Sequence, residues 1–163
     1  MASPDRQQRF PFGPPEAAGS GGANTGPTAR ARSGDAGERE RVATRLAHEL
    51  GQEAGVAFAY LHGSFVGGTA FHDVDVAVVA ALPSAEAFPV AALAERLSAA
   101  GALPVDVRLL NGAPVSFAYH AFRGRLLFSR DEELLTGVLE DAARRYLDAE
   151  PLLRQATREA FAR

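Results

Sequence analysis

Two aspartates separated by one residue, Asp73 and Asp75, stand in the valine-rich stretch DVDVAVV. If this stretch is a β-strand, both carboxylates lie on one face, because side chains alternate along a strand. Neighbouring carboxylates repel each other and are costly to remove from water unless a cation neutralises them. The pattern therefore predicts a magnesium site.

A Gly-Ser pair, Gly63-Ser64, precedes the two aspartates and is joined to them by a short glycine-containing connection. Gly63 allows the backbone to approach a phosphate closely. Ser64 offers a hydroxyl and a backbone N–H near the start of a helix, where anions bind readily. This pair predicts a phosphate-binding turn beside the metal site.

A third aspartate, Asp106, lies in the predicted strand PVDVRLL. If the strands pair with their polar faces aligned, Asp106 converges with Asp73 and Asp75. Mg²⁺ prefers hard oxygen ligands and keeps positions for substrate phosphates. Asp106 could bind one ion and accept a proton from an attacking hydroxyl. The turn and the three carboxylates together describe a nucleotidyl transfer centre, in which the α-phosphate of a triphosphate is attacked and pyrophosphate leaves.

Each of these residues also has a structural interpretation. Asp73 could be a loop residue, Asp75 and Asp106 could lie on exposed strand faces, and Ser64 could cap a helix. The other polar residues nearby are expected to make local packing, hydrogen-bond or ion-pair contacts and are assigned no catalytic role: His62, His72, Arg108, Tyr119 and His120.

Composition narrows the class of protein. The chain has 163 residues, 47% of them hydrophobic, which suffices for one domain with a core. Cysteine is absent, which excludes disulfides and cysteine zinc sites, and lysine is absent, which excludes a P-loop. The net charge of −3 argues against direct nucleic-acid binding. No apolar run is long enough for a membrane span and the N-terminus is not a secretory signal, so we expect a cytoplasmic protein.

The chain divides into a tail and one domain. Residues 1–34 hold half of the ten prolines and the tract GSGGANTG, which predicts a disordered Pro/Gly-rich tail. Residues 35–163 predict an α+β domain with a small mixed β-sheet and flanking helices. Helices are expected at 35–52, 83–100, 113–122 and 131–150, with Asn111 as a cap, and Pro151 is expected to break or kink the chain before a final helical piece. Strands are expected at 56–61, 71–81, 104–110 and 125–128.

Several segments resemble a known family. GSFVGGTAFHDVDVAV resembles the signature of the polymerase-β-type nucleotidyltransferases. VDVRLLNGAP, GRLLFSRDEE and RRYLDAEP are similar to the minimal nucleotidyltransferases that act as antitoxins beside HEPN-domain ribonuclease toxins. The resemblance covers about Arg39 to Leu153. The chain departs from the family in having eight residues between the Gly-Ser pair and the first aspartate, and Gly67 where an arginine is often found.

The resemblance implies a nucleotidyltransferase fold and roles for five residues. Asp73, Asp75 and Asp106 would bind Mg²⁺, with Asp106 helping to deprotonate the acceptor, and Gly63 and Ser64 would hold the triphosphate of ATP. The implied activity is transfer of AMP from ATP to a tyrosine of a partner HEPN toxin by a two-metal mechanism. Two alternatives stay open: a degenerate antitoxin that acts by binding alone, and a nucleotidyltransferase for a small molecule of the aminoglycoside type.

Overall fold

The computed structural model of the chain describes residues 34–68, 70–81 and 84–161, so the predicted tail lies outside the described residues except for Gly34. Four strands form one mixed sheet in the order β3-β2-β1-β4. β2 runs antiparallel to β1 and parallel to β3, and β1 runs antiparallel to β4. The strands are β1 (Val56–His62), β2 (Val74–Ala80), β3 (Val105–Leu109) and β4 (Arg125–Ser129). The predicted α+β class with a mixed sheet and flanking helices is confirmed.

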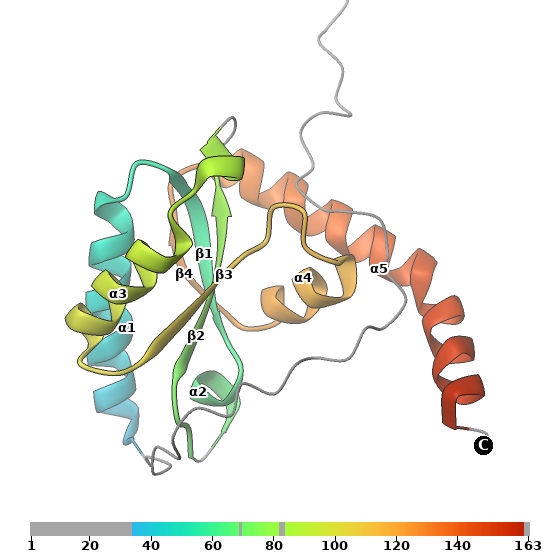
Figure 1. The fold of residues 1–163 in the computed structure, drawn as a ribbon, viewed down its shortest axis with the longest axis horizontal. Helices are drawn as coiled ribbons and strands as arrows, with labels where there is room; N and C mark the ends of the chain where they lie inside the picture. The colour runs from blue at the N-terminus through green and yellow to red at the C-terminus, as the bar shows by residue number, and fades with distance from the viewer. Residues whose placement is uncertain (1–33, 69, 82–83, 162–163) are drawn as a thin grey trace, which may run out of the picture.

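Helices cover both faces of this sheet (Figure 1). The α-helices are α1 (Ala36–Gln52), α2 (Ser64–Gly67), α3 (Val90–Gly101), α4 (Val115–Phe122) and α5 (Glu132–Phe161), and η2 (Ser84–Ala87) is a short 3₁₀ helix. α1 and α3 lie against one face, and α4 and α5 lie against the other. None of the described helices has the length and apolarity that a membrane span needs.

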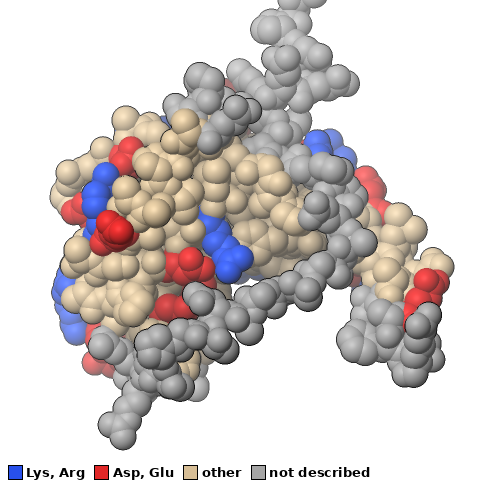
Figure 2. Space-filling model, viewed as in Figure 1, with Lys and Arg blue, Asp and Glu red and all other residues tan. Residues whose placement is uncertain are grey.

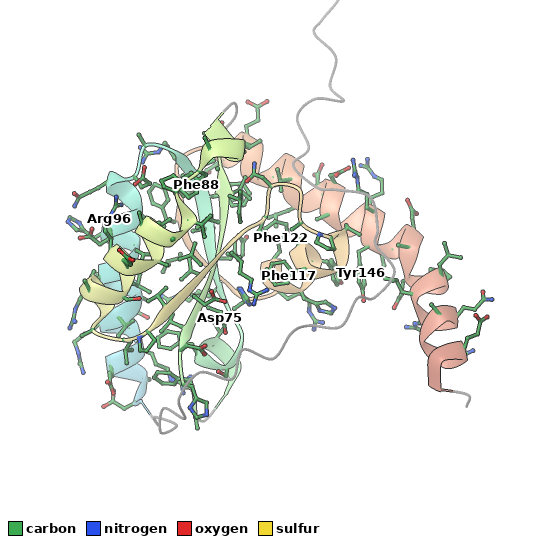
Figure 3. All side chains as sticks on the ribbon, viewed as in Figure 1. Asp75, Phe88, Arg96, Phe117, Phe122 and Tyr146 are labelled. Atoms are coloured by element: carbon green, nitrogen blue, oxygen red, sulfur yellow. The ribbon has the colours of Figure 1, made fainter. Side chains whose placement is uncertain are left out.

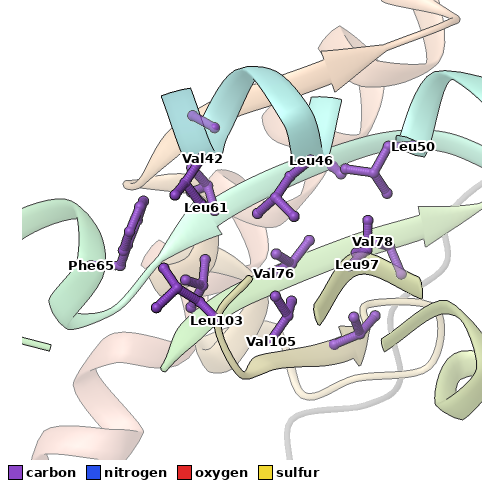
Figure 4. Packing of buried hydrophobic residues seen from close by; sticks show 14 of the residues in the cluster. Val42, Leu46, Leu50, Leu61, Phe65, Val76, Val78, Leu97, Leu103 and Val105 are labelled. Atoms are coloured by element: carbon purple, nitrogen blue, oxygen red, sulfur yellow. The ribbon is translucent and has the colours of Figure 1, made fainter. Parts of the chain in front are cut away.

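Alternation along β2 divides the core in two. Val74, Val76 and Val78 point toward α1 and α3, where they pack with Leu46 and Leu97 (Figure 4). The intervening residues of β2, beginning with Asp75, point toward α4 and α5, where a second cluster forms around Phe58, Tyr60 and Val138. Asp75 therefore belongs to the face covered by α4 and α5.

Two predicted boundaries differ from the structure. The second strand begins at Val74 instead of residue 71, because buried Phe71 makes an edge contact with Phe65, with ring centroids 4.9 Å apart, and the chain bends before the strand. The helix predicted at 83–100 begins at Val90, and its predicted start at residue 83 lies outside the described residues. Proline restricts the residue before it, so η2 ends and Pro89 stands at the N-cap of α3.

Pro151 does not divide the last helix. α5 continues from Glu132 to Phe161 with Pro151 inside it, and its C-terminal part turns away from the direction of the first part (Figure 1). Proline removes the N–H that would bond the carbonyl of Leu147. Leu147 is 60% exposed, so water can donate a hydrogen bond to that carbonyl. Proline is therefore tolerated inside the helix.

Asn111 has a different role from the predicted cap. The N-cap of α4 is Pro114, which makes no side-chain cap bond. The Asn111 side chain accepts a hydrogen bond from the backbone N–H of Ala80 at 2.8 Å and donates one to the Ala80 carbonyl at 3.1 Å. Asn111 therefore completes the hydrogen bonding at the end of β2.

Replacing Asn111 with alanine should lower the free energy of unfolding by about 2 kcal/mol, because a buried N–H and carbonyl lose their partners. Ala80 is 1% exposed, so water cannot easily replace the amide. Urea denaturation measures the change. Asn111→Asp, which keeps the acceptor and loses the donor, should fall between alanine and wild type; an unchanged midpoint for Asn111→Ala would contradict this role.

Candidate active site

Three polar side chains share one row across the sheet. His62 on β1 pairs with Asp75 on β2, and Asp75 pairs with Asp106 on β3. Residues paired in this way project to the same face of a sheet. The predicted convergence of Asp75 with Asp106 thus follows from parallel pairing of β2 and β3. Figure 3 labels Asp75 on the sheet.

Asp73 lies outside β2 but close enough to this row for its charge to act on Asp75. It lies in the bend before β2, so the prediction that one strand carries both Asp73 and Asp75 is wrong. The two charges nevertheless interact. Burial, followed by the charges of Asp73 and Asp106, raises the pKa of Asp75, and the guanidinium of Arg108 opposes this shift. Asp75 is half-buried between two other carboxylates.

Asp106 already has a cationic neighbour. Its Oδ2 atom lies 3.2 Å from Nε of Arg108, and the two side chains are 47% and 62% exposed. Of the local contacts that were expected for Arg108, the structure shows an ion pair on an exposed strand residue. Figure 2 shows acidic side chains beside a basic one in this part of the surface. An exposed ion pair of this kind contributes little to stability. A cation of higher charge, such as Mg²⁺, could therefore take the place of Arg108 beside Asp106.

The carboxylates suit magnesium in their chemistry. Among the described residues, no three His, Asp or Glu side chains are grouped closely enough to hold a metal ion together. The oxygen donors of Asp73, Asp75 and Asp106 are the type that Mg²⁺ prefers. The charge on Asp75 is destabilised by the other two, and a bound cation would remove that penalty.

The Gly-Ser turn adjoins Asp75 directly. Gly63 has φ of 70° and ψ of −157°, a backbone conformation that is almost restricted to glycine. A Cβ atom at Gly63 would overlap Oδ2 of Asp75. Gly63 is also the N-cap of α2, while exposed Ser64 is the first helical residue, so Ser64 is not the cap. Close contact with the Asp75 carboxylate thus requires glycine at position 63.

His62 is held by its neighbours on this face. Its ring makes an edge contact with Phe117 of α4, with centroids 5.6 Å apart. Burial and the charge of Arg108 lower the pKa of His62, and Asp106 opposes them. These contacts agree with the expected packing role. Tyr119 likewise stacks on Tyr146 at 3.9 Å.

The comparison with protein families shows which family the chain belongs to. A sequence model of the family described as "Polymerase beta, Nucleotidyltransferase" matches residues 45–133, more than half of the chain. The chain belongs to this nucleotidyltransferase family. The matched region contains both the Gly-Ser turn and all three aspartates. No curated protein sequence matches the chain significantly.

Solved structures show the same nucleotidyltransferase fold. A chain from a crystal structure of a toxin-antitoxin with AMP-PNP is 22% identical, with a TM-score of 0.54, over 74% of this chain and 94% of that one. A chain from a mutant of the toxin-antitoxin MntA-HpeT is 24% identical, with a TM-score of 0.51, over 72% and 89% of the two chains. A chain from a second MntA-HpeT mutant is 22% identical, with a TM-score of 0.51, over 76% of this chain and 94% of that one.

Arg39 of α1 contacts the segment that follows the Gly-Ser turn of this nucleotidyltransferase. Its guanidinium donates hydrogen bonds to the carbonyls of Phe65 at 2.7 Å and Gly68 at 2.8 Å. It also lies 5.8 Å and 5.1 Å from the ring centroids of Phe65 and Phe71. These contacts fix α2 and the glycine-containing connection against α1. Arg39 precedes the region that the family shares and was not singled out from the sequence, because nothing in its local pattern indicates such distant partners.

Replacing Arg39 with methionine should lower the free energy of unfolding by about 2 kcal/mol and raise the KM for ATP, because two carbonyls lose a charged donor. Arg39→Lys should recover only part of this, since an ammonium cannot span both carbonyls as a guanidinium does. Thermal denaturation and KM measurements test this. Exposed Arg45 on α1 provides the control: Arg45→Met should change neither quantity, and equal effects of both variants would contradict the assignment.

Proposed function

We propose that this chain transfers AMP from ATP to a tyrosine hydroxyl of a partner HEPN toxin and thereby acts as an antitoxin in the cytoplasm. The catalytic domain in this proposal is residues 35–163. The observation that carries it is Asp75, half-buried beside Gly63 and between the charges of Asp73 and Asp106. Membership of the nucleotidyltransferase family supports the chemistry, and the fold likeness to chains from toxin-antitoxin structures, one with AMP-PNP, supports the partner.

In the proposed reaction, the Gly63-Ser64 turn binds the triphosphate and Asp73, Asp75 and Asp106 bind Mg²⁺. Bound Mg²⁺ would neutralise the phosphates and polarise the α-phosphate. The tyrosine oxygen attacks the α-phosphorus, the bond from that phosphorus to the bridging oxygen breaks, and pyrophosphate leaves. Asp106 accepts the tyrosine proton; its exposure makes it the carboxylate that an incoming protein can reach.

The test uses the full chain, Mg²⁺ and the HEPN-domain protein encoded by a neighbouring gene. Label on the α-phosphate of ATP should appear on the HEPN protein, and label on the γ-phosphate should not. Transfer should require a tyrosine of the acceptor. No transfer by wild type, or equal transfer after loss of both Asp73 and Asp75, would contradict the proposal.

A second candidate is an antitoxin that neutralises by binding alone. The contact of Asp106 with Arg108 favours it, because the third carboxylate is already paired with a cation. This alternative predicts that Asp73→Ala/Asp75→Ala still neutralises the toxin. Under the catalytic proposal, the same variant still folds and binds but fails to neutralise. A toxicity assay in cells, together with co-purification of the two proteins, separates the two functions.

A further inference from the structure

A pocket of about 270 Å³ lies on the side of the Gly-Ser turn that faces the end of α4. One wall is made by Gly63, Val66 and Gly67, and the other by His120, Arg123 and Gly124. His62 also lines it. Because Gly63 lines this pocket and also touches the Asp75 carboxylate, the pocket directly adjoins the carboxylate site.

The chemistry of the pocket suits an anion. Its polar side chains are two imidazoles and one guanidinium, and no carboxylate lines it. A larger cavity of about 650 Å³ at the other end of the sheet differs in this respect, since Arg130 there lies among Asp131, Glu132 and Glu133. Of these two pockets, the one beside the turn has the positively charged lining that binds a phosphate.

Two groups in the pocket have no partner within the described part of the chain. The Arg123 side chain is exposed and makes no hydrogen bond or ion pair with the described residues. Nε2 of His62 is buried and has no hydrogen-bond partner there. A phosphate could accept a charge-assisted hydrogen bond from Arg123. It would also give Nε2 of His62 the partner that a buried polar atom ordinarily has.

The backbone beside Arg123 is held in place. The N–H of Gly124 donates to the carbonyl of Ala121 at 3.0 Å, and the N–H of Arg123 donates to His120 at 3.3 Å. A Cβ atom at Gly124 would overlap the carbonyl oxygen of Leu61, so this turn is packed closely against the end of β1. The backbone of Arg123 is therefore fixed opposite the Gly-Ser turn, and its exposed side chain extends from that position.

We propose that Arg123 and His120, from the turn between α4 and β4, bind the terminal phosphates of the nucleoside triphosphate in this pocket. The proposal rests on the proposed nucleotidyl transfer and deepens it. Gly67 provides no side chain on the opposite wall, and space beside it is open. A guanidinium from a distant part of the chain thus provides a positive charge that the glycine-containing connection lacks.

Calorimetric titration of the full chain with AMP-PNP and Mg²⁺, and separately with AMP and Mg²⁺, tests this inference. Arg123→Ala should weaken AMP-PNP binding about ten- to a hundredfold, the range for a charge-assisted hydrogen bond, and leave AMP binding unchanged. His120→Ala should act in the same direction, and Arg123→Lys should be milder. Exposed Arg144 on α5 is the control, and Arg144→Ala should bind both nucleotides as wild type does.

The outcomes distinguish this inference from the proposed function. If wild type binds AMP-PNP and both alanine variants bind it equally well, the pocket assignment is wrong and nucleotidyl transfer stands. If Arg123→Ala weakens AMP and AMP-PNP alike, the assignment to terminal phosphates is also wrong. If the AMP-PNP effect is found but no AMP reaches a HEPN protein, the pocket is supported and the proposed acceptor fails. Absence of AMP-PNP binding by wild type overturns both.

Discussion

Replacing Asp75 with asparagine should reduce AMP transfer at least about 100-fold and make the magnesium-free protein more stable at neutral pH. The loss of activity follows because the central carboxylate no longer holds the metal; removal of one preorganised electrostatic group typically costs this much. The gain in stability follows because burial and the charges of Asp73 and Asp106 make ionisation of Asp75 unfavourable, as its raised pKa indicates. Asparagine keeps the shape and removes the repulsion.

The sign of the pH dependence follows from the raised pKa of Asp75. The folded protein holds this proton more tightly than the unfolded chain, so Asp75 favours folding most at acidic pH. That contribution is lost as pH rises through the folded pKa. The asparagine side chain does not titrate, so the melting temperature of Asp75→Asn should exceed that of wild type increasingly as the pH rises from about 4, near the ordinary Asp pKa, toward neutrality.

Thermal denaturation at several pH values, with and without Mg²⁺ and ATP, measures both effects. Wild type should be stabilised by Mg²⁺ and ATP together, and Asp75→Asn should lose most of that stabilisation. Exposed Asp148 on α5 is the matched control, and Asp148→Asn should change neither transfer nor the pH profile. A lower melting temperature for Asp75→Asn at neutral pH would show that the Asp75 carboxylate stabilises the fold instead.

Local patterns were sufficient for the central part of the site. Valines alternating with Asp75 and Asp106 predicted two strands with carboxylates on one side, and parallel pairing of β2 and β3 brings these residues into register. The same alternation misplaced Asp73, because the pattern cannot detect that the ring of Phe71 packs against Phe65 and that the strand begins only at Val74. Strand periodicity therefore predicts a face reliably within a strand and less well at its end.

Residues that act through distant backbone groups could not be found in this way. The carbonyls that Arg39 binds are 26 and 29 residues away, and the Ala80 backbone that Asn111 binds is 31 residues away. An arginine on an exposed helix face and an asparagine before a helix have ordinary local interpretations, a solvated charge and a cap. Their actual roles depend on tertiary packing, which brings unsatisfied backbone groups within their reach.

Replacing Gly63 with alanine should lower the free energy of unfolding by about 3 kcal/mol or more and weaken ATP binding. Two costs combine. With φ of 70° and ψ of −157°, Gly63 has a backbone conformation that is almost restricted to glycine, and another residue there costs about 1–3 kcal/mol. The new methyl group also overlaps Oδ2 of Asp75, which adds an overpacking cost of about 1–3 kcal/mol. Urea denaturation measures the stability, and titration with AMP-PNP and Mg²⁺ measures the binding.

Gly112 separates these two costs. It has φ of 76°, and a Cβ atom there would meet nothing within 4 Å, so Gly112→Ala should cost only the backbone part, about 1–2 kcal/mol. The contact with Asp75 can be removed independently. In an Asp75→Ala background, the side chain at position 75 keeps only its Cβ atom. That atom lies 3.5 Å from the new methyl group at position 63, an ordinary van der Waals contact. Gly63→Ala should therefore cost only the backbone part in that background, about 1–3 kcal/mol.

The difference between the two backgrounds is the coupling energy of Gly63 with the Asp75 carboxylate. A coupling of about 1 kcal/mol or more would mean that close approach of the turn to the carboxylate, as well as its backbone conformation, requires glycine. Equal costs of Gly63→Ala in both backgrounds would mean that the positive φ alone requires it. In that case the turn and the carboxylate would be independent parts of the site, and the binding loss in Gly63→Ala would have to come from the altered backbone of the turn.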